Sequence, residues 1–166
     1  MPTVFNEADQ TYVRKTGCPD AFTWHTSDGL AERLAGKQVR MDIRSLDPGT
    51  WSYPYHFHHG VEEVFVVLAG EMSLRTPEGI RTLRTGDVVF CEMGASGAHQ
   101  LYNHTETPCR YLDLTTFVPL DVCEYPDTGK VLIRPEFRLF EKGPDRAYFE
   151  GEEDIAGVWN RLREGK

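Results

Sequence analysis

Several features that mark common protein classes are scarce or missing in this 166-residue sequence. No two of its cysteines form a C-x-x-C pair, which argues against a zinc ribbon or a dithiol redox site. No apolar run approaches the roughly 20 residues that a membrane-spanning helix needs. The first residues carry neither a basic start nor an apolar core, so we expect no signal peptide and a cytoplasmic location. We interpret the cysteines as buried or neutral thiols, with Cys91 as a minor candidate for lining a pocket.

Positive charge is also in deficit. The sequence has 18 basic residues against 26 acidic ones, a formal net charge of −8. Binding to nucleic acid needs a basic surface that displaces counterions, so we expect no nucleic-acid partner. The remaining composition, 40% hydrophobic and 27% charged, is ordinary for a globular protein. The length suits one domain with a sizeable core.

What the sequence does contain is a series of short strand-like segments separated by glycine and proline. Apolar and polar residues alternate over 39–44, as expected of a half-buried strand. The run 64–68 is apolar at every position, which favours a strand covered on both faces. Many short strands at regular spacing are typical of an all-β sandwich or barrel. The predicted strands of this region span 39–44, 64–68, 72–76, 80–83, 88–91, 99–103 and 110–115.

The two ends of the chain are less regular. We divide the chain into an N-terminal extension (1–36), a barrel core (37–118) and a C-terminal segment (119–166). Residues 30–35 predict a short helical turn in the extension. The C-terminal segment is predicted to begin with an irregular arm over 119–130 and to end in an amphipathic helix around Trp159, packed on the same domain or on a neighbouring subunit. Two edge strands are predicted between arm and helix, at 131–134 and 137–140.

The most informative segment is Tyr55-His56-Phe57-His58-His59-Gly60-Val61-Glu62-Glu63. In an extended strand, side chains two residues apart point to the same face, so His56 and His58 can reach one point in space. Imidazole and carboxylate groups are suitable ligands for divalent transition metals. By spacing alone either glutamate can join them. We favour Glu63, because it lies closer to the apolar run, where an uncompensated carboxylate would be costly.

The other histidines divide into one strong candidate and several weak ones. His99 begins a predicted strand directly after a loop of small residues, which allows a close approach to a buried site. His59 faces away from His58 and is an alternative ligand at most, while His25 and His104 have no partners in the sequence. Three imidazoles and one carboxylate leave one or two positions of an octahedral ion open, as reactive sites require.

The first of these segments resembles the first motif of the cupin superfamily, H-x-H-x(3,4)-E-x(6)-G. His56, His58, Glu63 and Gly70 fit this motif without adjustment. The glycine that leads the motif, Gly49, stands one residue early.

A second segment is similar to the second cupin motif, G-x(5)-P-x-G-x(2)-H-x(3)-N. Gly86, His99 and Asn103 fit it, whereas Glu92 stands where proline is usual and the loop to His99 is two residues longer. These departures fall in loops, so they leave the ligands intact and change the expected shape of the pocket mouth. The resemblance covers about 39–116, and the tail that begins at residue 121 is similar to a group of small single-domain bacterial cupins.

The resemblance implies a double-stranded β-helix, the jelly-roll barrel of cupins. The residue pattern adds an N-terminal extension and a short C-terminal helix to this barrel. It implies a divalent metal (Zn, Fe, Mn or Ni) held by His56, His58, Glu63 and His99. Strand phase adds candidates for the lining of a substrate pocket, none with an assigned catalytic role. These candidates are Met41, Phe65, Met93, Leu101, Asn103 and Tyr111.

Two functions fit such a site. The first is a metal-dependent enzyme of dioxygenase, isomerase or lyase type that acts on a small oxygen-bearing metabolite. The alternative is a non-catalytic module that binds a sugar or another small molecule, since a fold does not determine a function. The sequence offers no distinct general base beyond the ligands, and Glu92 is a weak candidate. We also expect a homodimer, because barrel edges and the C-terminal helix offer apolar surface to a second subunit.

Overall fold

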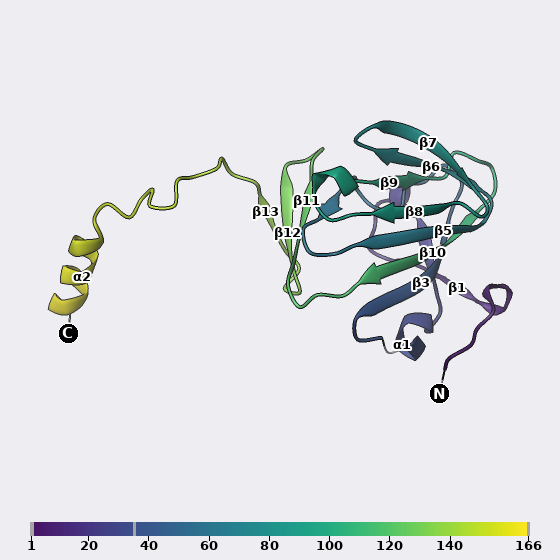
Figure 1. The fold of residues 1–166 in the computed structure, drawn as a ribbon, viewed down its shortest axis with the longest axis horizontal. Coiled ribbons are helices and arrows are strands. Elements are labelled where there is room, and N and C mark those ends of the chain that lie inside the picture. Colours follow the sequence, from purple (N-terminus) through teal and green to yellow (C-terminus); the bar gives the residue numbers. More distant parts are fainter. Residues whose placement is uncertain (1, 35, 166) are drawn as a thin grey trace.

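The computed structural model describes residues 2–34 and 36–165, most of which form a β-barrel with an extended C-terminal segment (Figure 1). Every strand pair in its sheets is antiparallel. The largest sheet has the order β1-β2-β3-β10-β5-β8. Its strands are β1 (Tyr12–Arg14), β2 (Trp24–Ser27), β3 (Val39–Leu46), β10 (Cys109–Thr116), β5 (Glu63–Ala69) and β8 (Val88–Cys91).

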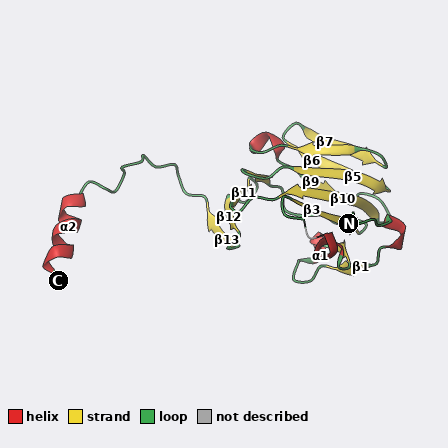
Figure 2. Cartoon of the chain, turned by 60° about the horizontal axis from the view of Figure 1, so that its bottom comes forward, coloured by secondary structure: helices red, strands yellow, loops and turns green. Residues whose placement is uncertain are grey.

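Two smaller sheets complete the β-structure (Figure 2). One has the order β7-β6-β9 and the other the order β13-β12-β11-β4. The pairs β3–β10, β6–β9 and β4–β11 join strands far apart in the sequence, as a jelly roll requires. The strands of these two sheets are β7 (Gly79–Arg84), β6 (Glu71–Thr76), β9 (Gln100–Tyr102), β13 (Arg138–Glu141), β12 (Lys130–Arg134), β11 (Asp121–Tyr125) and β4 (Phe57–His58).

The hydrophobic core lies between the largest sheet and the β7-β6-β9 sheet. Phe65 and Tyr111 reach it from the first, and Met72 and Leu101 from the second. Buried residues alternate with half-buried ones along β5 and β6, so one face of each of these strands points into the core. The cluster contains Trp24, Leu46, Phe65, Val67, Met72, Leu74, Leu83, Cys91, Leu101, Cys109 and Tyr111.

Helices are short and peripheral. The helix α1 (Leu30–Leu34) confirms the predicted turn up to residue 34, and residue 35 lies outside the described residues. The helix α2 (Ile155–Glu164) confirms the C-terminal helical pattern. Three single 3-10 turns are η1 (Glu7–Asp9), η2 (Asp20–Phe22) and η3 (Ala95–Gly97).

The all-β fold, with its N-terminal extension and short C-terminal helix, is therefore confirmed. The expectation of an irregular arm over 119–130 is wrong for its central part, because residues 121–125 form β11 and pair with both β12 and β4. The helix α2 lies away from the barrel at the end of an extended segment (Figure 1). Within the described chain, its predicted packing on the same domain is therefore not seen.

Candidate metal centre

Backbone pairing brings the motif histidines together. The short strand β4 places His58 opposite Cys123 of β11. His56, just before β4, forms an isolated bridge with His99, in which His99 N donates to His56 O at 2.9 Å. Glu63 is the first residue of β5. Two segments more than 40 residues apart thus meet at one end of the barrel.

Each of the three histidines has its Nδ1 bound to an acceptor. His56 Nδ1 donates to Pro54 O at 2.8 Å, and His99 Nδ1 donates to Gly97 O at 2.9 Å. His58 Nδ1 lies 2.6 Å from Asp121 Oδ2. Because the Nδ1 of each ring is already used, the Nε2 of each ring is the atom that can offer a lone pair to a metal once the ring is neutral. Metal-binding histidines show this arrangement, in which an outer acceptor fixes the tautomer and the ring.

The carboxylate of Glu63 faces two of these Nε2 atoms. Glu63 Oε2 lies 3.1 Å from His99 Nε2 and 3.6 Å from His58 Nε2. It is buried, and it has no hydrogen-bond partner by geometry among the described residues. A buried oxygen without a partner costs free energy unless a proton or a cation compensates it. The donor set and its orphan oxygen fit a divalent transition metal.

The pKa values of the site show how strongly these groups interact. Burial favours the neutral form of Glu63, but the neighbouring histidines outweigh it and lower the pKa of its carboxyl to about 2. Burial also opposes charge on His99, yet the side chains of Cys91 and Glu63 raise its pKa to about 10. Burial and the other histidines lower the pKa of His56 to about 3. A cation bound at Glu63 would replace the proton of His99, because an imidazole ligand must be deprotonated.

The four groups line a cavity of about 600 Å³. This is within the usual range of roughly 300–1,000 Å³ for small-molecule sites. The cavity is lined by four of the predicted pocket residues, namely Met41, Phe65, Leu101 and Tyr111.

Two of the predicted pocket residues are placed elsewhere. Met93 is 49% exposed on the loop after β8 and does not line the cavity. Asn103 is fully buried, but its amide donates to the carbonyls of Leu46 and Thr107, each at 2.8 Å. The strand β9 ends at Tyr102, so Asn103 anchors the following loop and does not continue the strand face of Leu101.

The weaker candidates lie outside the histidine cluster. His59 is exposed and lies 2.8 Å from Glu124, and Glu62 does not line the cavity. Glu92 is exposed and also stands away from the cavity lining. His25 approaches Asp47 at 3.4 Å, while His104 sits between surface side chains.

The loop before His99 is as compact as its small residues suggested. A side chain on Gly97 would overlap the carbonyl of Glu92, so only glycine fits without a shift of the loop. The same Gly97 supplies the carbonyl that orients His99. The loop therefore fixes both the position and the tautomer of this candidate ligand.

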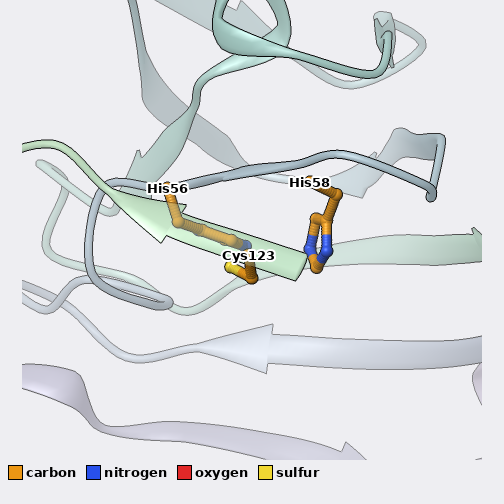
Figure 3. A group of neighbouring side chains, drawn as sticks. All are labelled: His56, His58 and Cys123. Atoms are coloured by element: carbon orange, nitrogen blue, oxygen red, sulfur yellow. The ribbon is translucent and has the colours of Figure 1, made fainter. Parts of the chain in front are cut away.

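Two residues of the site were missed in the sequence. Cys123 Sγ lies with His56 and His58 in a group whose ligand atoms are all within 4.8 Å of one another (Figure 3). Burial raises the pKa of Cys123 to about 12, so its thiol is neutral. Asp121, which orients His58, lies two residues earlier on the same strand face. The spacing D-x-C puts both side chains on one strand face, but nothing within this segment of the sequence linked that face to the histidines.

Residues 43–115 match the family model described as the cupin domain. The chain carries a cupin domain. Two solved structures are similar to this chain over most of its length. A proposed sugar phosphate isomerase from Acidithiobacillus ferrooxidans is 21% identical over 87% of this chain and 95% of that one, with a TM-score of 0.76. A sugar phosphate isomerase of the cupin superfamily from Silicibacter pomeroyi is 20% identical over 87% and 98%, with a TM-score of 0.73.

A third similar structure has a different name from the first two. A predicted oxalate decarboxylase from Thermotoga maritima is 19% identical over 70% of this chain and all of that one, with a TM-score of 0.58. At these identities the likeness establishes the fold. No curated protein matches this chain. Within its described residues, no helix is both long and apolar enough to cross a membrane.

Proposed function

We propose that the cupin domain holds one divalent transition metal through His56, His58, Glu63 and His99. The observation that carries this proposal is the buried Glu63 Oε2, which faces two imidazole nitrogens without a hydrogen-bond partner by geometry among the described residues. The outer acceptors on all three Nδ1 atoms support it. Iron, manganese, nickel and zinc all suit this donor set.

We further propose that the protein is an enzyme of isomerase, dioxygenase or lyase type, acting on a small oxygen-bearing metabolite. A bound divalent ion would supply Lewis-acid polarisation of substrate oxygens or a site for O2. The chain itself would supply a cavity of about 600 Å³ that orients the substrate, with apolar walls from Phe65 and Leu101 that exclude water. The names of the similar structures, two isomerases and a decarboxylase, support the same range of chemistry.

A specific observation favours the alternative, a module that binds a small molecule without converting it. The carboxylates in the cavity other than Glu63 are already engaged. Arg44 Nη1 lies 2.7 Å from Asp113, and Ser27 N donates to Asp42 at 3.3 Å. A general base needs to be free to reach the substrate, so this engagement leaves the cavity without an evident one.

Metal content tests the site. Protein purified without chelators should carry close to one metal ion per chain, measured by elemental analysis. The variant His58→Ala should lose it, because His58 contributes an inward Nε2. The matched control is His59→Ala, which removes the adjacent, exposed imidazole and should keep the metal. Absence of stoichiometric metal from the native protein, or its full retention by His58→Ala, would contradict the proposal.

Turnover separates the enzyme from the binding module. The metal-loaded protein should be offered dicarboxylates, catechols and sugars while the relaxation of metal-bound water is followed. Product formation supports the enzyme. Saturable binding without product supports the binding module.

We also infer a homodimer, and a small molecule as the other partner of the cupin domain. Apolar side chains are exposed on the segment 119–138, including Leu120 and Phe137, and on α2 around Trp159. Such surface is costly in water and is typical of association sites. A monomeric mass at micromolar concentration, measured by light scattering, would contradict the dimer.

A further inference from the structure

Two arginines that have no carboxylate partner among the described residues also line the cavity. Arg40 of β3 is exposed and Arg134 of β12 is half-buried, and both also line a smaller adjoining cavity of about 100 Å³. Among the described residues, neither makes an ion pair within 4.0 Å. Arg40 lies over the ring of Phe117 at 4.5 Å, and Arg134 over the ring of Phe137 at 5.6 Å. Stacking of this kind holds a guanidinium and leaves its N–H donors free.

Strand register connects both arginines to the candidate metal centre. Arg40 is paired with Thr115, which is in turn paired with Glu63, so the three residues form one row across β3, β10 and β5. Neighbouring strands are about 4.8 Å apart, which sets Arg40 and Glu63 roughly 10 Å apart along the row. Arg134 is paired with Asp121, the residue that orients His58. The arginines therefore approach the centre from two different sheets.

The charges inside the cavity differ from those of the whole chain. The chain has a net charge of −8. The cavity is nevertheless lined by four cationic side chains, Lys15, Arg40, Arg44 and Arg134, against three carboxylates. A divalent ion at the histidine cluster would add further positive charge. A positive cavity in an acidic protein attracts and concentrates small anions.

We propose that Arg40 and Arg134 bind an oxyanionic group, a phosphate or a carboxylate, on the small molecule that enters the cavity. Guanidinium groups match the oxygens of both anions and bind them with paired hydrogen bonds. The span of roughly 10 Å between Arg40 and Glu63 lets a short metabolite hold its anionic end at the arginines and its reacting oxygens at the metal. The placement of the reacting oxygens at the metal rests on the proposed function, whereas the binding of the anionic end by the arginines does not.

Binding of simple probes tests the anion site. Glycerol phosphate and malonate, followed by calorimetry on the metal-loaded protein, should bind saturably, whereas glycerol should not. Arg40→Gln and Arg134→Gln should each weaken the binding of the preferred anion about ten-fold or more, the usual effect of losing a charged hydrogen bond. The matched control is Arg138→Gln on β13, which removes an exposed arginine that does not line the cavity. It should bind like the native protein.

The outcomes separate the anion site from the metal proposal. Preference for glycerol phosphate or for malonate identifies the oxyanion, and both support the inference. The metal content of the arginine variants should equal that of the native protein. Inorganic phosphate, which needs only the arginine pair, should still bind to His58→Ala. If the protein holds metal but both arginine variants bind phosphate and malonate like the native chain, the anion site is wrong and the metal centre stands. Equal binding of glycerol, or equal weakening in Arg138→Gln, would also overturn the anion site.

Discussion

The barrel and the C-terminal helix have equally clear apolar patterns in the sequence, yet only in the barrel are the apolar side chains of the pattern buried. In the barrel, Leu46 and Met72 are fully buried. In α2, the apolar residues recur at helical spacing, but Trp159 is 58% exposed and Leu162 is 64% exposed. An apolar pattern specifies which face of an element is to be covered. Whether anything covers that face depends on a partner elsewhere in the fold.

Polar groups show the same contrast. In the candidate metal centre, buried groups hold one another in fixed orientations, as with His58 and Asp121 at 2.6 Å. Near α2, the ion pair between Arg161 and Asp154 is exposed at 3.1 Å. Exposed pairs typically contribute only about 0–1 kcal/mol, because water and salt screen them. The barrel is therefore the part of the molecule in which single substitutions should have large effects.

The largest effect is expected from replacing a leucine of the barrel core by alanine, and the same replacement in α2 is its matched counterpart. Leu46→Ala should lower the free energy of unfolding by about 2–5 kcal/mol, because it leaves a cavity in the core. Leu162→Ala should change it by less than about 0.5 kcal/mol, because the side chain is largely exposed. Urea unfolding of both variants measures the difference. Equal effects would show that α2 is buried in solution.

Glycines offer a second matched pair, with a smaller effect. Gly97→Ala should cost about 1–3 kcal/mol, because the new methyl group overlaps the carbonyl of Glu92. It should also weaken metal binding, since the shifted loop carries the acceptor of His99. Gly143→Ala in the C-terminal segment meets nothing within 4 Å and should leave both properties unchanged. Thermal unfolding with and without added metal checks both expectations. Unchanged metal affinity in Gly97→Ala would show that this loop does not position the candidate ligand His99.

The difference between local patterns and distant partners also explains which features could be predicted from the sequence. Strand phase brought together His56 and His58, because a two-residue period depends only on neighbours along one strand. Glu63 followed from its place at the start of the apolar run, where an uncompensated carboxylate would be costly. His99 followed from a loop of small residues and a strand, which are also local signals. The strand segments of the barrel were found for this reason, and their positions agree with β3 and β5–β10.

What local signals could not supply is pairing between distant segments. The strand β11 was expected to be irregular, and it owes its form to pairing with β12 and β4. Asp121 and Cys123 reach the site only through that pairing, so no spacing within their own segment revealed them. Asn103 was assigned to the pocket by strand phase, but β9 ends before it. The strand period fails where a side chain anchors a loop.

Asp121 tests whether this distant pairing matters for the site. Asp121→Asn should weaken metal affinity about 10–100-fold, because it removes the carboxylate that fixes the tautomer and orientation of His58. The matched control is Asp127→Asn, which breaks an exposed ion pair with Arg75 and should leave metal affinity unchanged. Competition with a chelator measures the affinity. The idea fails if the two variants bind metal equally well.

The smallest effect on the barrel is expected from removing residues 143–166. Within the described part of this segment every residue except Gly157 is exposed, so its loss should change the free energy of unfolding of the barrel by less than about 0.5 kcal/mol. Light scattering on the same samples shows whether the apolar stripe of α2 is used. If α2 contacts a second subunit, the shortened chain should dissociate at a higher concentration than the full chain while its barrel unfolds as before. A large loss of stability in a chain that is monomeric at both lengths would instead place α2 on its own barrel, and the contrast between the two regions would disappear.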